Sequence, residues 1–311
     1  MHKRITWTTT YSTDRRETEK YISEEITFDA NGNTLDHTLF DRLGKPEHRM
    51  VFRYSDLSGN LLEQVEYDFL NGLIERKEFF EGSEGEMYKT VITYNDGSTE
   101  TREYAFSDLG KADRATIRDD TGEQTGEEIF AYDDDDNLIL EIEKDAAGNE
   151  VLRIEHDFAP GPLLKSMRTF VNGKLKESAT FGYNAYGSAT IRIKKDGSGA
   201  VIESEVTSYS DQNIIIDKRL ETHTRSGKVV EESMYDHAGN MVLVEIRTGG
   251  KLTFRNACSY DDDLRLIREE LLEVTTHGRV VRHEKLEHHY EGGAPPRRRS
   301  EMGSGETYGE W

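Results

Sequence analysis

Hydrophobic and polar residues alternate along most of this chain, in segments about eight to nine residues long, which is an ordinary strand length. A helix would need longer unbroken segments with a period of about 3.6 residues, and none is convincing. The pattern predicts an all-β protein. In the segment 87–94, for example, one face carries Tyr88, Thr90, Ile92 and Tyr94, and the other carries Met87, Lys89, Val91 and Thr93.

An aromatic residue followed by a turn-forming cluster recurs about every 26 residues. Asp and Asn side chains in such clusters bond to their own downstream backbone, and Gly or Asn supplies the positive φ that a short hairpin loop needs. The clearest copies are the segments 28–33 (FDANGN) and 235–240 (YDHAGN). The aromatic positions are Phe28, Tyr54, Phe80, Phe106, Tyr132, Phe158, Tyr183, Tyr209, Tyr235 and Tyr260.

A second set of turns lies midway between the first, for example at Asn71-Gly72, Asp96-Gly97 and Asn172-Gly173. The chain therefore reverses about every 13 residues, and such short connections favour antiparallel pairing of neighbouring strands. The predicted fold is a long antiparallel meander of tandem hairpin repeats over residues 1–290. Because so long a sheet must twist, a curled or single-layer sheet is preferred. A β-propeller is the alternative, although the doubled period of a four-stranded blade is not visible.

Two stretches depart from this pattern. In the turn after Phe158, Pro160 and Pro162 replace the usual acidic residues, which indicates a longer loop or a sheet edge. Residues 291–311 have no strand pattern, and we expect them to form a flexible C-terminal tail that contains Pro, Gly and Arg. The other interpretation of this tail is a docking segment with Arg297, Arg298, Arg299 and Trp311 as the contacts.

Composition narrows the class of protein. Apolar residues make up only 34% of the 311 residues and the formal net charge is −21, so a thick core is not expected. An evenly spread 15 Tyr and 12 Phe argue against disorder. The acidic balance argues against a nucleic-acid or anionic-membrane partner, and no stretch is long and apolar enough for a membrane span. The single Cys258 excludes an intrachain disulfide. With no visible secretory signal, we expect a cytoplasmic protein, or one exported without a cleaved signal peptide.

No motif for catalysis, cofactor binding or metal binding stands out. His283 and His288 are five residues apart on a predicted strand, whereas a zinc-protease motif needs two His four apart on a helix. The acidic run Asp133–Asp136 lacks the Gly and Glu that an EF-hand loop needs at its sixth and twelfth positions. The sequence predicts a protein that is not an enzyme and that has no cofactor.

The turn motif, aromatic-Asp-x-x-Gly-Asn, resembles that of the YD-repeat or RHS-repeat family. The segments 28–33 and 235–240 match it best, whereas Tyr132-Asp133 and Tyr260-Asp261 keep only the first two positions. In that family the repeats form a sheet strip that spirals into a shell, often around a toxin domain. The resemblance implies a bacterial toxin, packaging or immunity setting, although 311 residues are few for a closed shell.

The leading hypothesis is a non-enzymatic binding or scaffold module whose partner is a protein. The alternative is a carbohydrate-binding repeat protein at a cell surface. The candidate binding residues are Tyr54, Tyr132, Tyr183, Tyr209 and Tyr235, because aromatic side chains along one exposed edge can stack on sugars or hold a protein. Their regular spacing is also what a structural anchor under the next turn would produce. The sequence leaves the oligomeric state open.

Overall fold

The computed structural model describes residues 2–14, 16–70, 72–83, 85–107, 110–225 and 227–292. These residues form antiparallel strands joined by short turns, with no helix among them. The strands are β1 (His2–Tyr11), β2 (Glu17–Phe28), β3 (Thr34–Phe40), β4 (Pro46–Tyr54), β5 (Leu61–Asp68), β6 (Gly72–Glu81), β7 (Met87–Tyr94), β8 (Thr99–Phe106), β9 (Ala112–Arg118), β10 (Gln124–Tyr132) and β11 (Leu138–Asp145). They continue with β12 (Glu150–Phe158), β13 (Leu164–Val171), β14 (Lys174–Tyr183), β15 (Ala189–Asp196), β16 (Val201–Tyr209), β17 (Ile215–Thr224), β18 (Gly227–Tyr235), β19 (Met241–Thr248), β20 (Lys251–Tyr260), β21 (Leu266–Val274) and β22 (Val280–Glu291).

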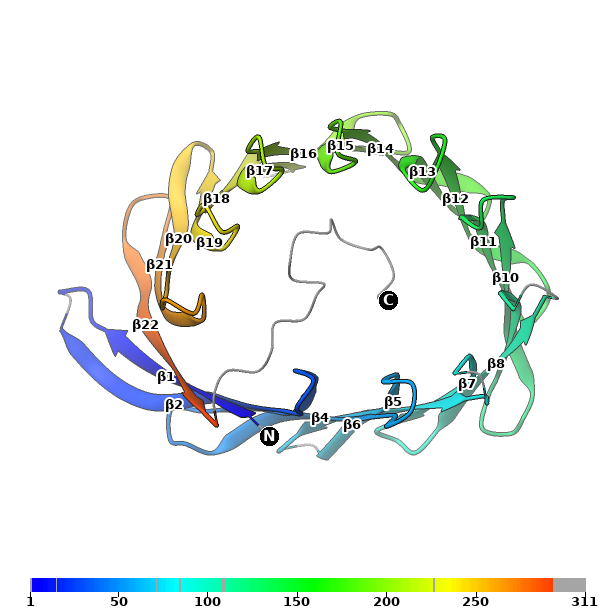
Figure 1. Ribbon diagram of the computed structural model, residues 1–311, viewed down its shortest axis with the longest axis horizontal. Helices are drawn as coiled ribbons and strands as arrows, with labels where there is room; N and C mark the ends of the chain where they lie inside the picture. The colour runs from blue at the N-terminus through cyan, green and yellow to red at the C-terminus, as the bar shows by residue number, and fades with distance from the viewer. Residues whose placement is uncertain are drawn as a thin grey trace.

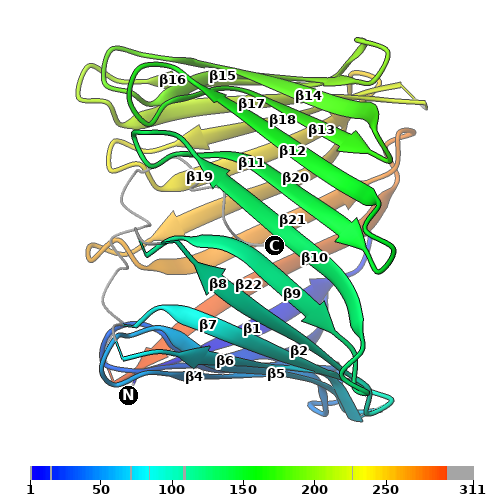
Figure 2. The same ribbon diagram turned by 90° about the vertical axis from the view of Figure 1, so that its right-hand side faces the viewer.

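The sheet closes on itself. Each strand pairs with the next one along the chain, and β1 also pairs with β22, from Lys3 opposite Glu291 to Thr10 opposite Glu284. The result is one continuous ring of tilted strands (Figures 1 and 2). The predicted all-β meander is confirmed and its curling is complete, whereas the propeller alternative is not supported, because the strands belong to a single sheet.

The Asp of the repeat motif holds its turn together. In the turn after β18, Asp236 Oδ1 accepts hydrogen bonds from the backbone N–H groups of Ala238 and Asn240, at 2.8 and 2.9 Å. The Asn240 side chain donates to Asp236 Oδ2 at 2.9 Å, and Gly239 takes a positive φ of 81°. The Asp side chain thus provides hydrogen-bond acceptors for backbone N–H groups of the turn, as turn residues commonly do. The turn after β2 repeats it with Asp29 and Asn33.

The aromatic-led turns all lie at one end of the ring. Because each of them follows an even-numbered strand, antiparallel pairing brings them to the same end, which we name the aromatic rim; the turns after odd-numbered strands form the opposite rim. Neighbouring turns of the aromatic rim also contact one another. Lys111 Nζ donates to the Asp136 backbone carbonyl at 2.7 Å, and Asn184 Nδ2 donates to Asn213 Oδ1 at 2.8 Å.

The two proline residues lie in a loop, not at a sheet edge. β12 and β13, which flank Pro160 and Pro162, pair with each other, and each also pairs with its other neighbour. The Ala159 N–H donates to the Leu163 carbonyl at 2.9 Å, which closes the loop. The loop therefore occupies the place of an ordinary turn of the aromatic rim.

Side chains alternate between two faces of the ring, and the cross-strand register connects each face without interruption around the closure. One face contains most of the buried side chains, and we assign it to the inside of the ring, because side chains on a concave surface converge. We name it the concave face and the other the outer face. Its buried members are Thr6, Thr8, Thr10, Ile26, Thr90, Ile92, Ala115, Ile117, Ala179, Thr207, Ser233, Val244, Asn256, Glu284 and His288.

Candidate functional site

A group of carboxylates on the concave face of β10 and β11 has few balancing cations nearby. Glu128 lies directly opposite Glu143 in the register, and Glu141 is on the same face of β11. Like charges at directly opposite positions destabilise a sheet. We name Glu128, Glu141 and Glu143 the carboxylate cluster. The register thus places two acidic side chains directly against each other.

The environment of the cluster raises the proton affinity of two members. Burial raises the pKa of Glu128, and the charges of Glu143 and Glu100 add to this effect, while Arg102 opposes it from 2.5 Å. Burial also raises the pKa of Glu141, with a further contribution from Glu128. A raised carboxylate pKa means that the folded protein disfavours the charged form. The cluster therefore stores unfavourable electrostatic energy at neutral pH.

Two side chains near the cluster leave this charge largely uncompensated. The His156 Nε2 atom is 3.8 Å from Glu141 Oε1, but burial lowers the pKa of His156, so its imidazole is neutral at pH 7. Arg102 divides its guanidinium between Glu128 and Glu100, the latter at 2.9 Å. In the described part of the chain, Glu143 forms no ion pair. A ligand that brings cationic groups would therefore find acceptors here.

On the outer face, an arginine lies between carboxylates that oppose each other. Glu63 and Glu78 also face each other in the register, but the Arg76 guanidinium lies between them, 2.7 Å from Glu63 and 3.0 Å from Glu78. Glu232 and Glu245 also face each other, and the Arg247 guanidinium lies 3.9 Å from Glu232 and 2.6 Å from Glu245. Like charges on that face are therefore bridged, and the carboxylate cluster stands out by comparison.

Aromatic side chains accompany the cluster on the concave face. Tyr104 lies opposite Ala115, which lies opposite Glu128, and Phe130 lies opposite Glu141. Ala115 is fully buried. Carboxylates next to aromatic rings form a surface that suits guanidinium and ammonium groups, since both kinds of group attract cations.

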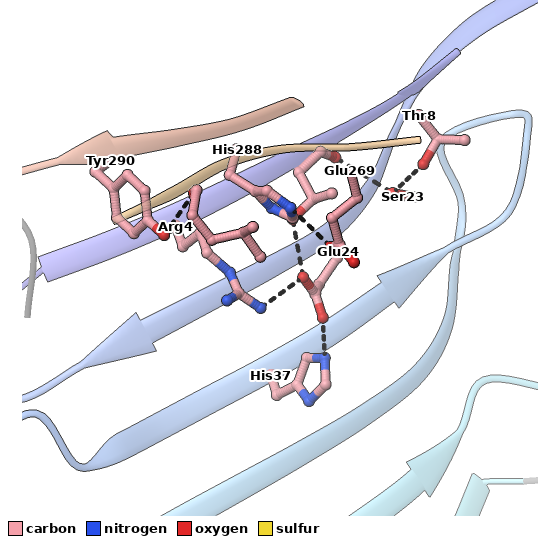
Figure 3. A network of polar contacts seen from close by, with 10 residues as sticks. Arg4, Thr8, Ser23, Glu24, His37, Glu269, His288 and Tyr290 are labelled. Carbon is pink, nitrogen blue, oxygen red and sulfur yellow. Dashed lines mark hydrogen bonds and ion pairs between the residues drawn. The ribbon is translucent and has the colours of Figure 1, made fainter. Parts of the chain in front are cut away.

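A second polar network closes the ring, where β1 meets β22 (Figure 3). The Thr6 hydroxyl donates to Glu24 Oε2 at 2.8 Å and lies 3.0 Å from His288 Nδ1. The other imidazole nitrogen of His288 is 3.0 Å from Glu269 Oε1. Arg4 donates to Glu24 at 2.9 Å. These contacts join two strands near the chain start to two near its end.

The closure network lowers the pKa of two of its carboxylates. Burial raises the pKa of Glu24, but the hydrogen bond with His37 and the charge of Arg4 outweigh it and lower the pKa from 4.5 to about 2. The hydrogen bond with His288 lowers the pKa of Glu269 against the effect of burial. Because these half-buried carboxylates have a lower pKa in the folded protein, their ionised forms stabilise the closure at neutral pH.

The closure network contains a hydroxyl, an imidazole and a carboxylate in series, an order that activates nucleophiles in hydrolases. Here Thr6 is only 1% exposed, and its hydroxyl already donates to Glu24. A substrate atom has no access to this hydroxyl. The series joins strands, and we assign it no chemical step.

The candidate tyrosines lie on one belt of the concave face, at the aromatic rim. Tyr183, Tyr209 and Tyr235 end successive even-numbered strands, whereas Tyr54 and Tyr132 are farther around the ring. The hydroxyls of Tyr132, Tyr183 and Tyr209 donate to the carbonyls of Ala112, Leu164 and Ala189, at 3.1, 2.7 and 3.0 Å. Each carbonyl belongs to the first residue of the preceding strand, so these tyrosines anchor the repeat. Their proposed binding role stays a prediction.

The tail candidates Arg297, Arg298, Arg299 and Trp311 lie outside the described residues. The histidines considered for a metal site are separated by the sheet: the register places His283 and His289 on the outer face and His288 on the concave face. His283 stacks on Tyr11, with ring centroids 4.8 Å apart. Within the described ranges, no group of three or more His, Cys, Asp or Glu side chains could hold a metal ion.

Sequence reasoning missed the carboxylate cluster because acidic residues are too numerous for one pair to be selected. A signal was nevertheless present. The turn at 133–137 sets the pairing of β10 with β11, and counting outward from it places Glu128 opposite Glu143. The closure network had no comparable local signal, since Thr6 and His288 are brought together only when the ring closes.

Comparisons with known proteins give no family assignment. No family model matches the chain, and no curated protein matches it. Among solved structures, the chain is similar to a chain of the Photorhabdus luminescens Tc holotoxin pore, with 12% identity and a TM-score of 0.33. That match covers 89% of this chain and 19% of the other, so the chain spans about a fifth of the toxin chain's length.

Two other solved structures also match with low sequence identity and low TM-scores. A porin-like protein from Bacteroides uniformis matches with 14% identity and a TM-score of 0.28, over 93% of this chain and 97% of that chain. A crystal structure of TcdB2-TccC3 matches with 9% identity and a TM-score of 0.22, over 86% of this chain and 22% of the other. Among the described residues, no helix is long and apolar enough to cross a membrane. The all-β array agrees with a YD-like hairpin repeat, and no family model confirms membership.

Proposed function

We propose that this protein is a non-enzymatic scaffold whose concave face binds a basic segment of a partner protein. The observation that carries the proposal is the carboxylate cluster, in which Glu128 and Glu143 oppose each other with too few cations nearby. A partner that supplies Lys or Arg side chains would neutralise this charge, and the gain would favour binding.

The physical reason is a trade between stability and binding. Repulsion within the cluster costs folding free energy, and residues kept at such a cost are typical of functional sites. Charge-assisted hydrogen bonds between guanidinium groups and carboxylates are about twice as strong as neutral ones. The closed ring contributes by holding the carboxylates at fixed positions before the partner arrives, which lowers the entropy cost of association.

The test uses a fluorescein-labelled hexa-arginine peptide as the probe and the double variant Glu141→Gln/Glu143→Gln. We expect the variant to bind the peptide at least tenfold more weakly by fluorescence anisotropy and to unfold at a higher temperature than the parent. Mass spectrometry of the peptide after prolonged incubation should find it intact, as a binding role without catalysis requires.

The matched control is Glu103→Gln/Glu270→Gln, which removes the same amount of charge from exposed positions of the outer face. This control should bind the peptide as the parent does. Equal losses in both double variants would mean that the peptide responds only to net charge, and the proposal would fail. Cleavage or modification of the peptide would contradict the non-enzymatic role.

A further inference from the structure

An aromatic-lined depression opens on the ring near the opposite rim, away from the carboxylate cluster. Trp7 of β1, Ile22 of β2 and Phe40 of β3 line it, and Leu43 in the turn after β3 forms part of its wall. Its volume is about 320 Å³, near the lower end of the range of about 300–1,000 Å³ for ligand pockets. The space suits one large apolar side chain.

The turn after β3 can be compared with the other turns of the opposite rim. The turn after β3 is built as its counterparts are, with the N–H of its third residue donating to Asp41 Oδ1 at 2.8 Å. That third residue is Leu43, whose side chain is 80% exposed. In other turns of the opposite rim, the third position holds a polar or small residue: Asp96, Thr121, Ala147, Ser198 and His277.

Exposed apolar residues are also found one turn farther along the same rim. Phe69 and Leu70, in the turn after β5, are 50% and 93% exposed. The Phe69 N–H donates to the Glu47 carbonyl at 3.0 Å, which attaches this turn to the start of β4, next to the turn that carries Leu43. Turn geometry does not require large apolar side chains at these positions. Large exposed apolar side chains that gather on neighbouring turns are typical of interaction sites.

Two of the charged groups around the depression form close ion pairs, and Arg42 does not. Glu25 is paired with Lys3 at 2.9 Å, and Lys20, whose ammonium is 5.9 Å from the Trp7 ring centroid, is paired with Glu287 at 2.8 Å. Arg42 is 63% exposed, and the nearest carboxylate, that of Glu19, is 3.7 Å away, too far for a hydrogen bond. The Arg42 guanidinium therefore keeps its donors available to a ligand.

We infer that this depression docks a partner-protein segment that presents a large apolar side chain next to a carboxylate. The apolar side chain lies against Trp7, Ile22, Phe40 and Leu43, and the carboxylate accepts hydrogen bonds from Arg42. Arginine matches a carboxylate with two parallel N–H donors, which gives the contact direction as well as strength.

The experiment exploits the tryptophan content, because Trp7 and Trp311 are the two tryptophans of the chain. In a Trp311→Phe background, Trp7 alone reports on the depression. The probes are the peptides acetyl-Leu-Asp-amide and acetyl-Leu-Asn-amide, which are nearly identical in shape and differ in charge. We expect a saturable change in Trp7 fluorescence with the Asp peptide and at least fivefold weaker binding of the Asn peptide.

Two variants locate the effect. Arg42→Gln should weaken the Asp peptide at least fivefold and leave the Asn peptide unchanged, whereas Arg114→Gln, an exposed outer-face arginine on β9, should change neither. Equal binding of the two peptides, an unchanged affinity in Arg42→Gln, or no saturable response to either peptide would overturn the inference. A response to acetate equal to that of the Asp peptide would also overturn it, since it would reveal only a simple anion site.

Discussion

At the scale of single residues, the molecule depends on side chains that satisfy backbone groups. The Asp of each complete motif accepts two backbone hydrogen bonds inside its own turn, as Asp29 and Asp236 do. Burial raises the pKa of Asp236, but the hydrogen bonds from Asn240 and Ala238 outweigh it and leave the pKa below the usual value. The ionised Asp is therefore part of the turn structure, and this explains why the motif recurs.

Replacing the turn aspartate should cost measurable stability. Asp236→Ala removes the acceptor of two backbone N–H groups and of the Asn240 amide, so we expect a loss of about 1–2 kcal/mol in the free energy of unfolding. Urea denaturation followed by circular dichroism measures the change. The control is His237→Ala in the same turn, at an exposed position. Equal effects of the two substitutions would show that the hydrogen bonds of Asp236 contribute little.

At the scale of elements, two kinds of strand pairing hold the ring together. Hairpin neighbours are joined by their turns, so their register follows from loop length. The pair β1–β22 has no such connection, and its register must be specified by side chains. The closure network fulfils this need, because a slip of one residue would move His288 to the outer face and separate it from Thr6 and Glu269.

Acid should weaken the closure through Glu24. Since its folded pKa, about 2, is below the unfolded value of 4.5, the stability that it contributes is present above pH 4.5 and lost as the pH falls towards 2. The difference in unfolding free energy between the parent and Glu24→Gln should shrink by about 2 kcal/mol from pH 6 to pH 3. Denaturation curves at both pH values test this. A difference that stays constant or grows on acidification would contradict the assignment.

At the scale of the whole molecule, closure removes the edge strands that an open meander would expose. Unpaired edges invite association with other chains, and a complete ring abolishes them. In the expected open or partly curled strip, β1 and β22 would each need charging or capping; instead they pair with each other. A chain with only 34% apolar residues can fold in this way because each strand gains two hydrogen-bonded neighbours.

A disulfide across the closure tests the ring directly. Thr8 and Leu286 lie directly opposite each other on β1 and β22, so Thr8→Cys/Leu286→Cys in a Cys258→Ser background should oxidise within one chain. Intact-protein mass spectrometry should record the loss of two hydrogens in the monomer. The control Thr8→Cys/Lys194→Cys places the second thiol on β15, across the ring (Figure 1). Free thiols in the first variant, or oxidation of both variants alike, would argue against closure.

Much of this architecture could be predicted because its information is local. The Asp, Gly and Asn of 235–240 specify a turn by themselves, and alternation in 87–94 specifies a strand with the two faces that the register confirms. The tyrosine positions were equally visible, but their hydroxyl contacts with Ala112, Leu164 and Ala189 needed coordinates. The carboxylate cluster was within reach of a register argument, and the abundance of Glu and Asp concealed it.

Reading the chain alone establishes where it turns, which segments extend and which neighbours pair, because each of these follows from residues at most a few positions apart. It does not establish that the first and last strands meet. That depends on the accumulated twist of every strand between them, a sum of small angles that no local pattern specifies. The concave face and the contact between Thr6 and His288 follow from that closure.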